Sequence, residues 1–162
     1  MADDYTDCEV SGIDLSPVQT VFVPPNCTFY VGNVLEGLFF HEDKFDLIQS
    51  RAIMAGIPAD GWVSYLQEVK RMLKPGGWVQ LVEIDPFLKC DDGSLPEDSA
   101  MKFYTSVISE VVERKNGCLC AGLGLKQPEF LKEAGFINIK ENHKKAPTGW
   151  AEGMISSRHH LH

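Results

Sequence analysis

Short apolar segments with alternating polar residues recur along this chain, separated by longer segments of helical periodicity. A period of two predicts β-strands, because successive side chains of a strand point to opposite faces of a sheet. Prolines and glycines separate the segments, and Pro24-Pro25 excludes a long helix between the first two. The pattern predicts strands at 9–14, 27–31, 45–50, 78–84 and 136–142. Strands that alternate with helices indicate an α/β fold.

Three segments carry apolar side chains at helical spacing. The first helix is predicted over 60–74, with Asp60 as its N-cap and an apolar stripe of Trp62, Leu66, Val69 and Leu73. The second is predicted over 96–114, with the stripe Met101, Tyr104, Ile108 and Val111, flanked by Val107 and Val112. A third helix, over 128–134, is closed by Gly135, in the position of a C-terminal capping glycine.

Length and composition fit one folded domain, which we expect over 1–150, followed by a disordered tail at 151–162. The net charge of −8 disfavours nucleic acid as a ligand, because a phosphate backbone binds to basic surfaces. No apolar stretch reaches 18 residues, and the acidic start of the chain lacks the layout of a signal peptide. We therefore expect no membrane span and a cytoplasmic or nuclear location.

The five cysteines do not show metal-ligand spacing, so we expect reduced thiols. The histidines His159, His160 and His162 could suggest a metal cluster, but a chain terminus with several histidines is more often frayed. We expect no metal site.

Two polar residues stand where predicted strands end. Asp14 follows a short apolar strand and could accept hydrogen bonds from ribose hydroxyls, or it could form a turn with the Leu-Ser-Pro that follows. Asn33 follows the second strand and could meet an adenine ring together with the backbone of Val34, or it could be an ordinary Gly-Asn turn residue. The residue types alone leave both alternatives open.

Charged residues also follow the later strands. Glu83 and Asp85 lie two apart at the end of the fourth strand, where they could bind substrate, act as a general base, or be solvated carboxylates. Arg51 follows the third strand and could hold a carboxylate ligand or lie free on the surface. The Gly122-x-Gly124 pair follows a helix and a loop, so it does not have the context of a dinucleotide-binding fingerprint.

Several motifs together resemble one family. They are Val10 to Pro17, Pro24-Pro25-Asn26, Phe45 to Arg51 and, above all, Leu73-Lys74-Pro75-Gly76-Gly77-Trp78 followed by Glu83. These stretches resemble class I S-adenosylmethionine-dependent methyltransferases, and within them the fungal LaeA-like group linked to secondary metabolism. The similarity extends over roughly Ala2 to Trp150.

The resemblance implies a Rossmann-like sheet with helices on both faces and S-adenosylmethionine as cofactor. It implies that Asp14 binds the ribose, that Leu15 and Ser16 flank the adenosine, and that Asn33 and the Val34 backbone meet the adenine. Ser50 and Arg51 would face the methionine end. The methyl acceptor would be a small molecule or a protein. No catalytic residue follows, because many members of the family act mainly by aligning the two reactants.

The chain also departs from the family pattern. No glycine loop of the form G-x-G precedes Asp14, so the resemblance implies a sheet that lacks its first strand with that loop, and also its last strand. In that family the seven strands lie across the sheet in the order 3-2-1-4-5-7-6. The absent first strand would therefore lie between the strands predicted at 9–14 and 45–50. Those two strands could pair directly, pair within a homodimer, or accept a strand from a partner; we expect the homodimer.

Two function classes are compatible with these features, and a third is weaker. The chain could be a methyltransferase, or a non-catalytic methyltransferase-like module that binds or regulates; the absent glycine loop favours the second for these 162 residues. Half of an NAD-binding oxidoreductase is disfavoured by the LKPGGW motif and by the absence of G-x-G-x-x-G.

Overall fold

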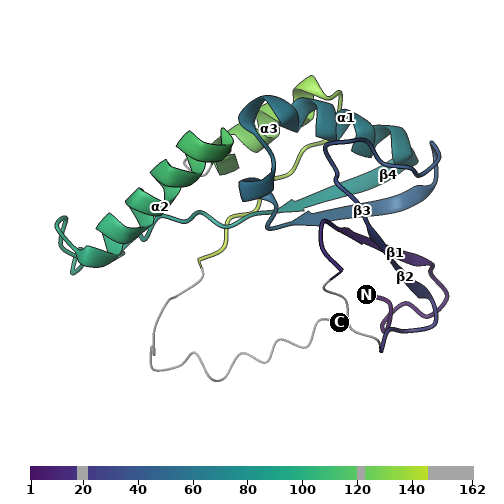
Figure 1. Cartoon of the computed structure of the whole chain (residues 1–162), viewed down its shortest axis with the longest axis horizontal. Helices are drawn as coiled ribbons and strands as arrows, with labels where there is room; N and C mark the ends of the chain where they lie inside the picture. The colour runs from purple at the N-terminus through teal and green to yellow at the C-terminus, as the bar shows by residue number, and fades with distance from the viewer. Residues whose placement is uncertain (18–21, 120–122, 146–162) are drawn as a thin grey trace.

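The computed structural model describes residues 1–17, 22–119 and 123–145 (Figure 1). The predicted tail at 151–162, the terminal histidines, Cys120 and Gly122 lie outside the described residues.

The first two strands form a parallel pair. β1 (Val10–Asp14) lies beside β2 (Cys27–Val31) in the register Val10 to Cys27 through Asp14 to Val31, which confirms the two strands predicted from alternation. A Cβ added at Gly12 would clash with the Phe29 ring, so glycine lets that ring lie across β1.

Residues 1–8 are anchored to the start of β2. They form hydrogen-bonded turns. The Asn26 side-chain amide donates to the carbonyl oxygens of Ala2, Tyr5 and Cys8 at 2.8–3.1 Å. The Pro-Pro-Asn motif therefore has a structural use, since its asparagine holds these turns in place.

The next elements form the centre of the molecule. β3 (Phe45–Arg51) leads through two short 3-10 turns, η1 (Met54–Gly56) and η2 (Ala59–Gly61), into helix α1 (Trp62–Met72) and strand β4 (Leu73–Val82). β3 and β4 pair in parallel from Leu47–Trp78 to Arg51–Val82. This is a β-α-β unit, as expected when a parallel pair is joined by a crossover helix.

The LKPGGW motif is a bulge within this unit. Leu73 pairs with Phe45, and the register then shifts before Leu47 meets Trp78. Gly76 has a φ of +83°, which side chains rarely tolerate, and a Cβ on Gly77 would lie 2.9 Å from the Lys74 carbonyl oxygen. The two glycines therefore allow the helix-to-strand turn to close.

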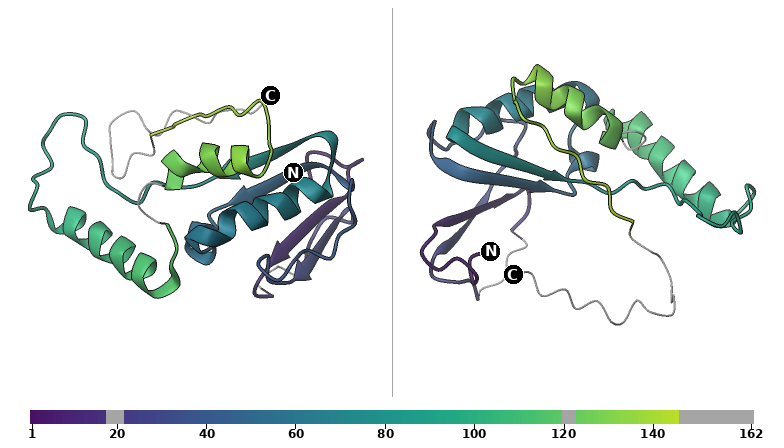
Figure 2. Two further views of the ribbon diagram at one scale, coloured as in Figure 1. Left: turned by 90° about the horizontal axis from the view of Figure 1, so that it is seen from above. Right: turned by 180° about the vertical axis from the view of Figure 1, so that it is seen from behind.

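The core lies between α1 and the β3–β4 sheet. Trp62, Leu66 and Val69 of α1 are fully buried, as the helical spacing predicts. Helix α3 (Leu123–Glu133) packs against α1, with the Phe130 ring stacked on Trp62 at 6.3 Å between centroids. Figure 2 shows α1 and α3 side by side over one face of β3–β4.

Helix α2 (Ala100–Asn116) begins four residues later than predicted. Ser99 is its N-cap, accepting a hydrogen bond from the Met101 backbone N–H, and Gly117 ends it with a left-handed φ of 66°. Unlike α1, it extends away from the strands (Figure 1).

Two sequence predictions about these elements are wrong. Asp60 lies within η2 and does not cap α1, which follows Gly61 without a side-chain cap. Segment 136–142 is not a strand: Asn138 has a φ of +57°, which interrupts an extended backbone, and the described residues give it no ladder partner.

The arrangement of the sheets also differs from the expected one. Within the described residues, the β1–β2 and β3–β4 pairs are separate two-stranded sheets, so β1 and β3 do not pair directly. Helices α1 and α3 cover one face of β3–β4, while Leu47, Trp78 and Val82 are exposed on the strands. The parallel α/β class holds, but the described helices do not cover both faces.

The glycine bulge yields a stability prediction. Gly77→Ala should lower the free energy of unfolding by about 1–3 kcal/mol, because the new methyl group meets two backbone carbonyl oxygens that cannot move independently. Gly124→Ala is the matched control: nothing lies within 4 Å of its Cβ position in α3, so it should be neutral or stabilise by up to about 1 kcal/mol. Urea unfolding measures both; equal effects would contradict the crowding described for Gly77.

Candidate functional site

The carboxyl ends of β1 and β2 bring two predicted site residues together. Asp14 ends β1, and its carbonyl oxygen accepts a hydrogen bond from Gly32 N–H at 2.9 Å, which places Asn33 beside it. The exposed Asp14 carboxylate accepts the Ser16 N–H at 2.9 Å through Oδ1, which uses one of its roughly four lone-pair positions. Leu15, between them, is also exposed.

Asn33 forms a similar local turn. Its Oδ1 accepts the Leu35 N–H, and its Nδ2 donates to Glu36 Oε1, both at 3.0 Å. Asp14 and Asn33 thus each organise a turn, as one of the two alternatives predicts, and each lies exposed or half-buried at a strand end, where the cofactor alternative stays a prediction.

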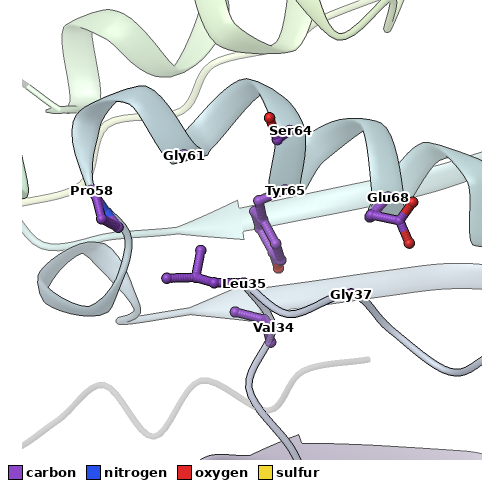
Figure 3. Close-up of a pocket in the computed structure, with 8 residues that line it drawn as sticks. All are labelled: Val34, Leu35, Gly37, Pro58, Gly61, Ser64, Tyr65 and Glu68. Atoms are coloured by element: carbon purple, nitrogen blue, oxygen red, sulfur yellow. The ribbon is translucent and has the colours of Figure 1, made fainter.

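Val34 lies at a hollow between this turn and α1. Figure 3 shows the Tyr65 side chain extending from α1 toward Val34 and Leu35. The hollow has a volume of about 280 Å³. Ligand pockets usually occupy about 300–1,000 Å³, so the hollow lies at the small end of that range.

Ser50 and Arg51 lie in different environments at the end of β3. Ser50 is buried, and its hydroxyl shares a 2.7 Å hydrogen bond with the Tyr65 hydroxyl. Arg51 is exposed. The structure therefore joins Ser50 to the Val34 hollow through Tyr65, while Arg51 faces solvent.

Glu83 joins this buried polar group from the end of β4. Its Oε1 accepts the Ile53 N–H at 3.0 Å, while its buried Oε2 has no hydrogen-bond partner among the described residues. Burial raises the pKa of Glu83, and burial together with the Glu83 charge raises the pKa of Tyr65 against the effect of the Ser50 hydrogen bond. The residue before Ile53, Ala52, has a φ of +55°, a conformation that costs a non-glycine residue energy and often marks functional sites.

Asp85 does not join this group. Its carboxylate accepts the Phe87 N–H and pairs with Lys89, and the lysine hydrogen bond is the main cause of its lowered pKa. The two strand-end carboxylates therefore differ: Glu83 braces the turn after β3, and Asp85 is a solvated turn residue.

Arg71 connects the first strand pair to the core. Its guanidinium donates to the carbonyl oxygens of Leu38 and Phe40, each at 3.0 Å, and pairs with Glu68. That pairing lowers the pKa of Glu68. The segment between β2 and β3 is thus fastened to α1 immediately after Asn33 and Val34.

Aromatic rings reinforce the same connection. Tyr30 of β2 contacts Phe39 and Phe40 at centroid distances of 5.1 and 5.4 Å, and Phe40 contacts Phe45 of β3 at 5.0 Å. These separations are typical of favourable ring pairs. They form a continuous link from β2 to β3 where backbone ladder bonds do not.

Sequence patterns do not assign these roles to Tyr65 and Arg71. Helical spacing indicates only that Tyr65 borders the core stripe, and position indicates only that Arg71 is a helix-end cation. A polar tip on an otherwise apolar helix face is the one signal that points to Tyr65, because a buried phenol needs a partner. Arg71 offers no such signal, since its acceptors are backbone carbonyls about thirty residues away.

Other site types find no support in the described part of the chain. It contains no group of three His, Cys, Asp or Glu side chains able to hold a metal ion. Within the same residues, no helix is both long and apolar enough to cross a bilayer.

The Glu83 environment yields a pH prediction. The folded-state pKa of Glu83 is raised above its ordinary value of 4.5, so the folded protein binds this proton more tightly than the unfolded chain. The free energy of unfolding should therefore fall as pH rises from about 4.5 through the folded pKa. The fall should be about 1 kcal/mol or less, because solvent still screens this half-buried carboxylate. Glu83→Gln should remove it, as measured by urea unfolding between pH 4 and pH 7.

Asp85→Asn is the control for Glu83, with the opposite sign. The pKa of Asp85 is lowered, so its contribution is present above its ordinary value of 3.8 and is lost only as pH falls through the folded pKa. Above pH 4.5, the free energy of unfolding of Asp85→Asn should therefore fall with pH as steeply as that of the wild type. A Glu83→Gln profile that also keeps this slope would contradict the assignment.

Comparison with known proteins places this chain in a family. Residues 1–77 match a family model described as a methyltransferase domain. The chain is 35% identical over 149 residues to the secondary metabolism regulator LAE1 of Cochliobolus heterostrophus, which covers 91% of this chain and 47% of that protein.

Two further relatives carry methyltransferase names. The protein-methionine methyltransferase laeA of Emericella nidulans is 34% identical over 86% of this chain and 36% of its own length. The methyltransferase pytC of Aspergillus terreus is 31% identical over 86% of this chain and 42% of its own length. The chain spans less than half the length of each of these relatives, and it belongs to the fungal LaeA-like group of methyltransferases.

Proposed function

We propose that this chain carries the nucleotide-binding part of an S-adenosylmethionine-dependent methyltransferase. The observation that supports this most is the juxtaposition of Asp14 and Asn33 at the carboxyl ends of two paired parallel strands. Ligands of open α/β sheets bind at these strand ends.

Each site residue has a proposed role in this arrangement. Asp14 accepts hydrogen bonds from the ribose hydroxyls, with Leu15 and Ser16 flanking the adenosine. Asn33 and the Val34 backbone meet the adenine edge, and Val34 also lines the hollow beside Tyr65. Ser50 and Arg51 lie at the methionine end of the cofactor. Arg51 is exposed and contacts it directly, whereas Ser50 is buried and acts by holding the Tyr65 hydroxyl in place.

When bound, S-adenosylmethionine supplies an electrophilic methyl group on a sulfonium. The residues of this chain bind and orient the cofactor, and the methyl acceptor is a small molecule or a protein. The name of the Emericella nidulans relative, a protein-methionine methyltransferase, favours a protein acceptor.

A regulatory module is the second candidate function. Relatives are named secondary metabolism regulators. In this role the chain binds partners in the cytoplasm or nucleus. The outer edges of β1 and β3, which have no ladder partner among the described residues, accept a strand from a partner.

Calorimetry with S-adenosylhomocysteine tests the site. We expect weak binding by the wild type, which Asp14→Ala weakens by at least about tenfold, because each hydrogen bond to a charged group contributes roughly 1.5–3 kcal/mol. Asp7→Ala removes the same charge from an exposed position away from the strand ends and should bind like the wild type. Adenosine should compete with the ligand. Binding that is unchanged in Asp14→Ala would refute the assignment.

A methyl-transfer assay separates the two functions. Radiolabelled S-adenosylmethionine, offered with cell-extract proteins as acceptors, should give no turnover with this chain alone, because the proposed site holds mainly the nucleotide end of the cofactor. A misplacement of the reacting groups by about 1 Å can lower the rate of methyl transfer roughly 100-fold. Steady turnover that depends on Asp14 would favour the enzyme. No turnover together with no Asp14-dependent cofactor binding would favour the module.

A further inference from the structure

Helix α2 exposes an apolar stripe to solvent. Met101, Tyr104, Ile108 and Val111 follow one another at spacings of three, four and three, and between 42% and 65% of each residue's surface is accessible. Phe103 and Val107 widen the exposed surface. This spacing is the a/d pattern by which two helices pack along a seam.

The polar side of α2 faces its own domain. Lys102, Thr105 and Val112 are half-buried, and Ser109 is buried with no hydrogen-bond partner for its hydroxyl among the described residues. Its contacts with the body run through η1, and Figures 1 and 2 show the rest of the helix extending away from the sheets. The usual amphipathic orientation is thus reversed, which indicates that the stripe is covered by something outside this domain.

Opposite charges flank the two ends of this stripe. Glu97 and Asp98 lie exposed just before the helix, where Glu97 pairs with Lys102, and Arg114 and Lys115 lie exposed in its last turn, where Arg114 pairs with Glu110. In the antiparallel direction each of these exposed charges meets an opposite charge of a second copy, because Lys102 then also lies opposite Glu110. Parallel pairing would instead place like charges together.

One antiparallel register satisfies both the apolar and the charged positions. When Tyr104 lies opposite Ile108 of the second copy, Met101 lies opposite Val111. The same register places Glu97 opposite Lys115 and Asp98 opposite Arg114. The pairings then repeat through the two-fold axis, as an isologous interface requires.

We propose that this chain forms a homodimer through antiparallel pairing of α2 with α2 of a second copy. The dimer buries the apolar stripe and leaves the Asp14–Asn33 strand ends free on each protomer. It does not rest on the proposed function.

Sedimentation velocity over a range of concentrations tests the dimer. The wild type should approach twice 18.1 kDa, and Ile108→Glu should sediment as an 18.1 kDa monomer. Ser106→Glu, at an exposed position of the same helix, and Ile137→Glu, at an exposed apolar position elsewhere, should remain dimeric. Circular dichroism checks that each variant is folded. A wild-type monomer at every concentration, or a dimer that survives Ile108→Glu, would overturn the proposal; the second result would point to the strand edges.

Charge reversal tests the direction of pairing. Reversing the acidic end (Glu97→Lys with Asp98→Lys) or the basic end (Arg114→Glu with Lys115→Glu) should weaken dimerisation about tenfold or more. Reversing both ends together should restore it, because the antiparallel complementarity returns. A parallel pair would not be weakened by reversal of one end, and that outcome would also contradict the proposal.

Discussion

Side chains make the main links between the two parallel strand pairs of this molecule, because no ladder hydrogen bond joins the pairs within the described residues. The backbone N–H groups of Asp43 and Lys44, which donate to the carbonyl oxygens of Arg71 and Met72, add to these links just before β3. The Arg71 guanidinium provides the central link, fastening the carbonyl oxygens of Leu38 and Phe40 to the last turn of α1. Rings from Tyr30 to Phe45 extend the link. The position of the Asp14–Asn33 strand ends relative to the core depends on this connection.

The Arg71 link also bears on the polar side chains Ser50, Tyr65 and Glu83, which lie next to the hollow lined by Val34. The segment fastened by Arg71 brings Val34 against α1, where Tyr65 binds Ser50 and lies near the Glu83 charge. Glu83 in turn braces the turn after β3. A half-buried carboxylate whose second oxygen has no hydrogen-bond partner among the described residues is costly, and carboxylates with a raised pKa of this kind are common at functional sites.

The sequence contains enough information for the parts of the fold that depend on local periodicity. Alternation located the first four strands, and helical spacing located α1 and its buried face. Segment 136–142 has the same alternation, but a strand also needs a partner and an uninterrupted extended backbone, and Asn138 breaks the latter. For the candidate site, strand-end position identified Asp14 and Asn33. The Ser50–Tyr65 hydrogen bond and the Arg71 link join residues 15 to 33 positions apart, and single-chain patterns carry no signal for such pairs.

Native-state amide hydrogen exchange on Arg71→Ala tests the dependence on this link most directly. The amides of β1 and β2 should exchange at least about tenfold faster than in the wild type, while those of α1, β3 and β4 keep their protection. Arg114→Ala, which removes an exposed arginine from α2, should change neither group. Equal acceleration throughout the molecule, or no acceleration in β1 and β2, would contradict the account.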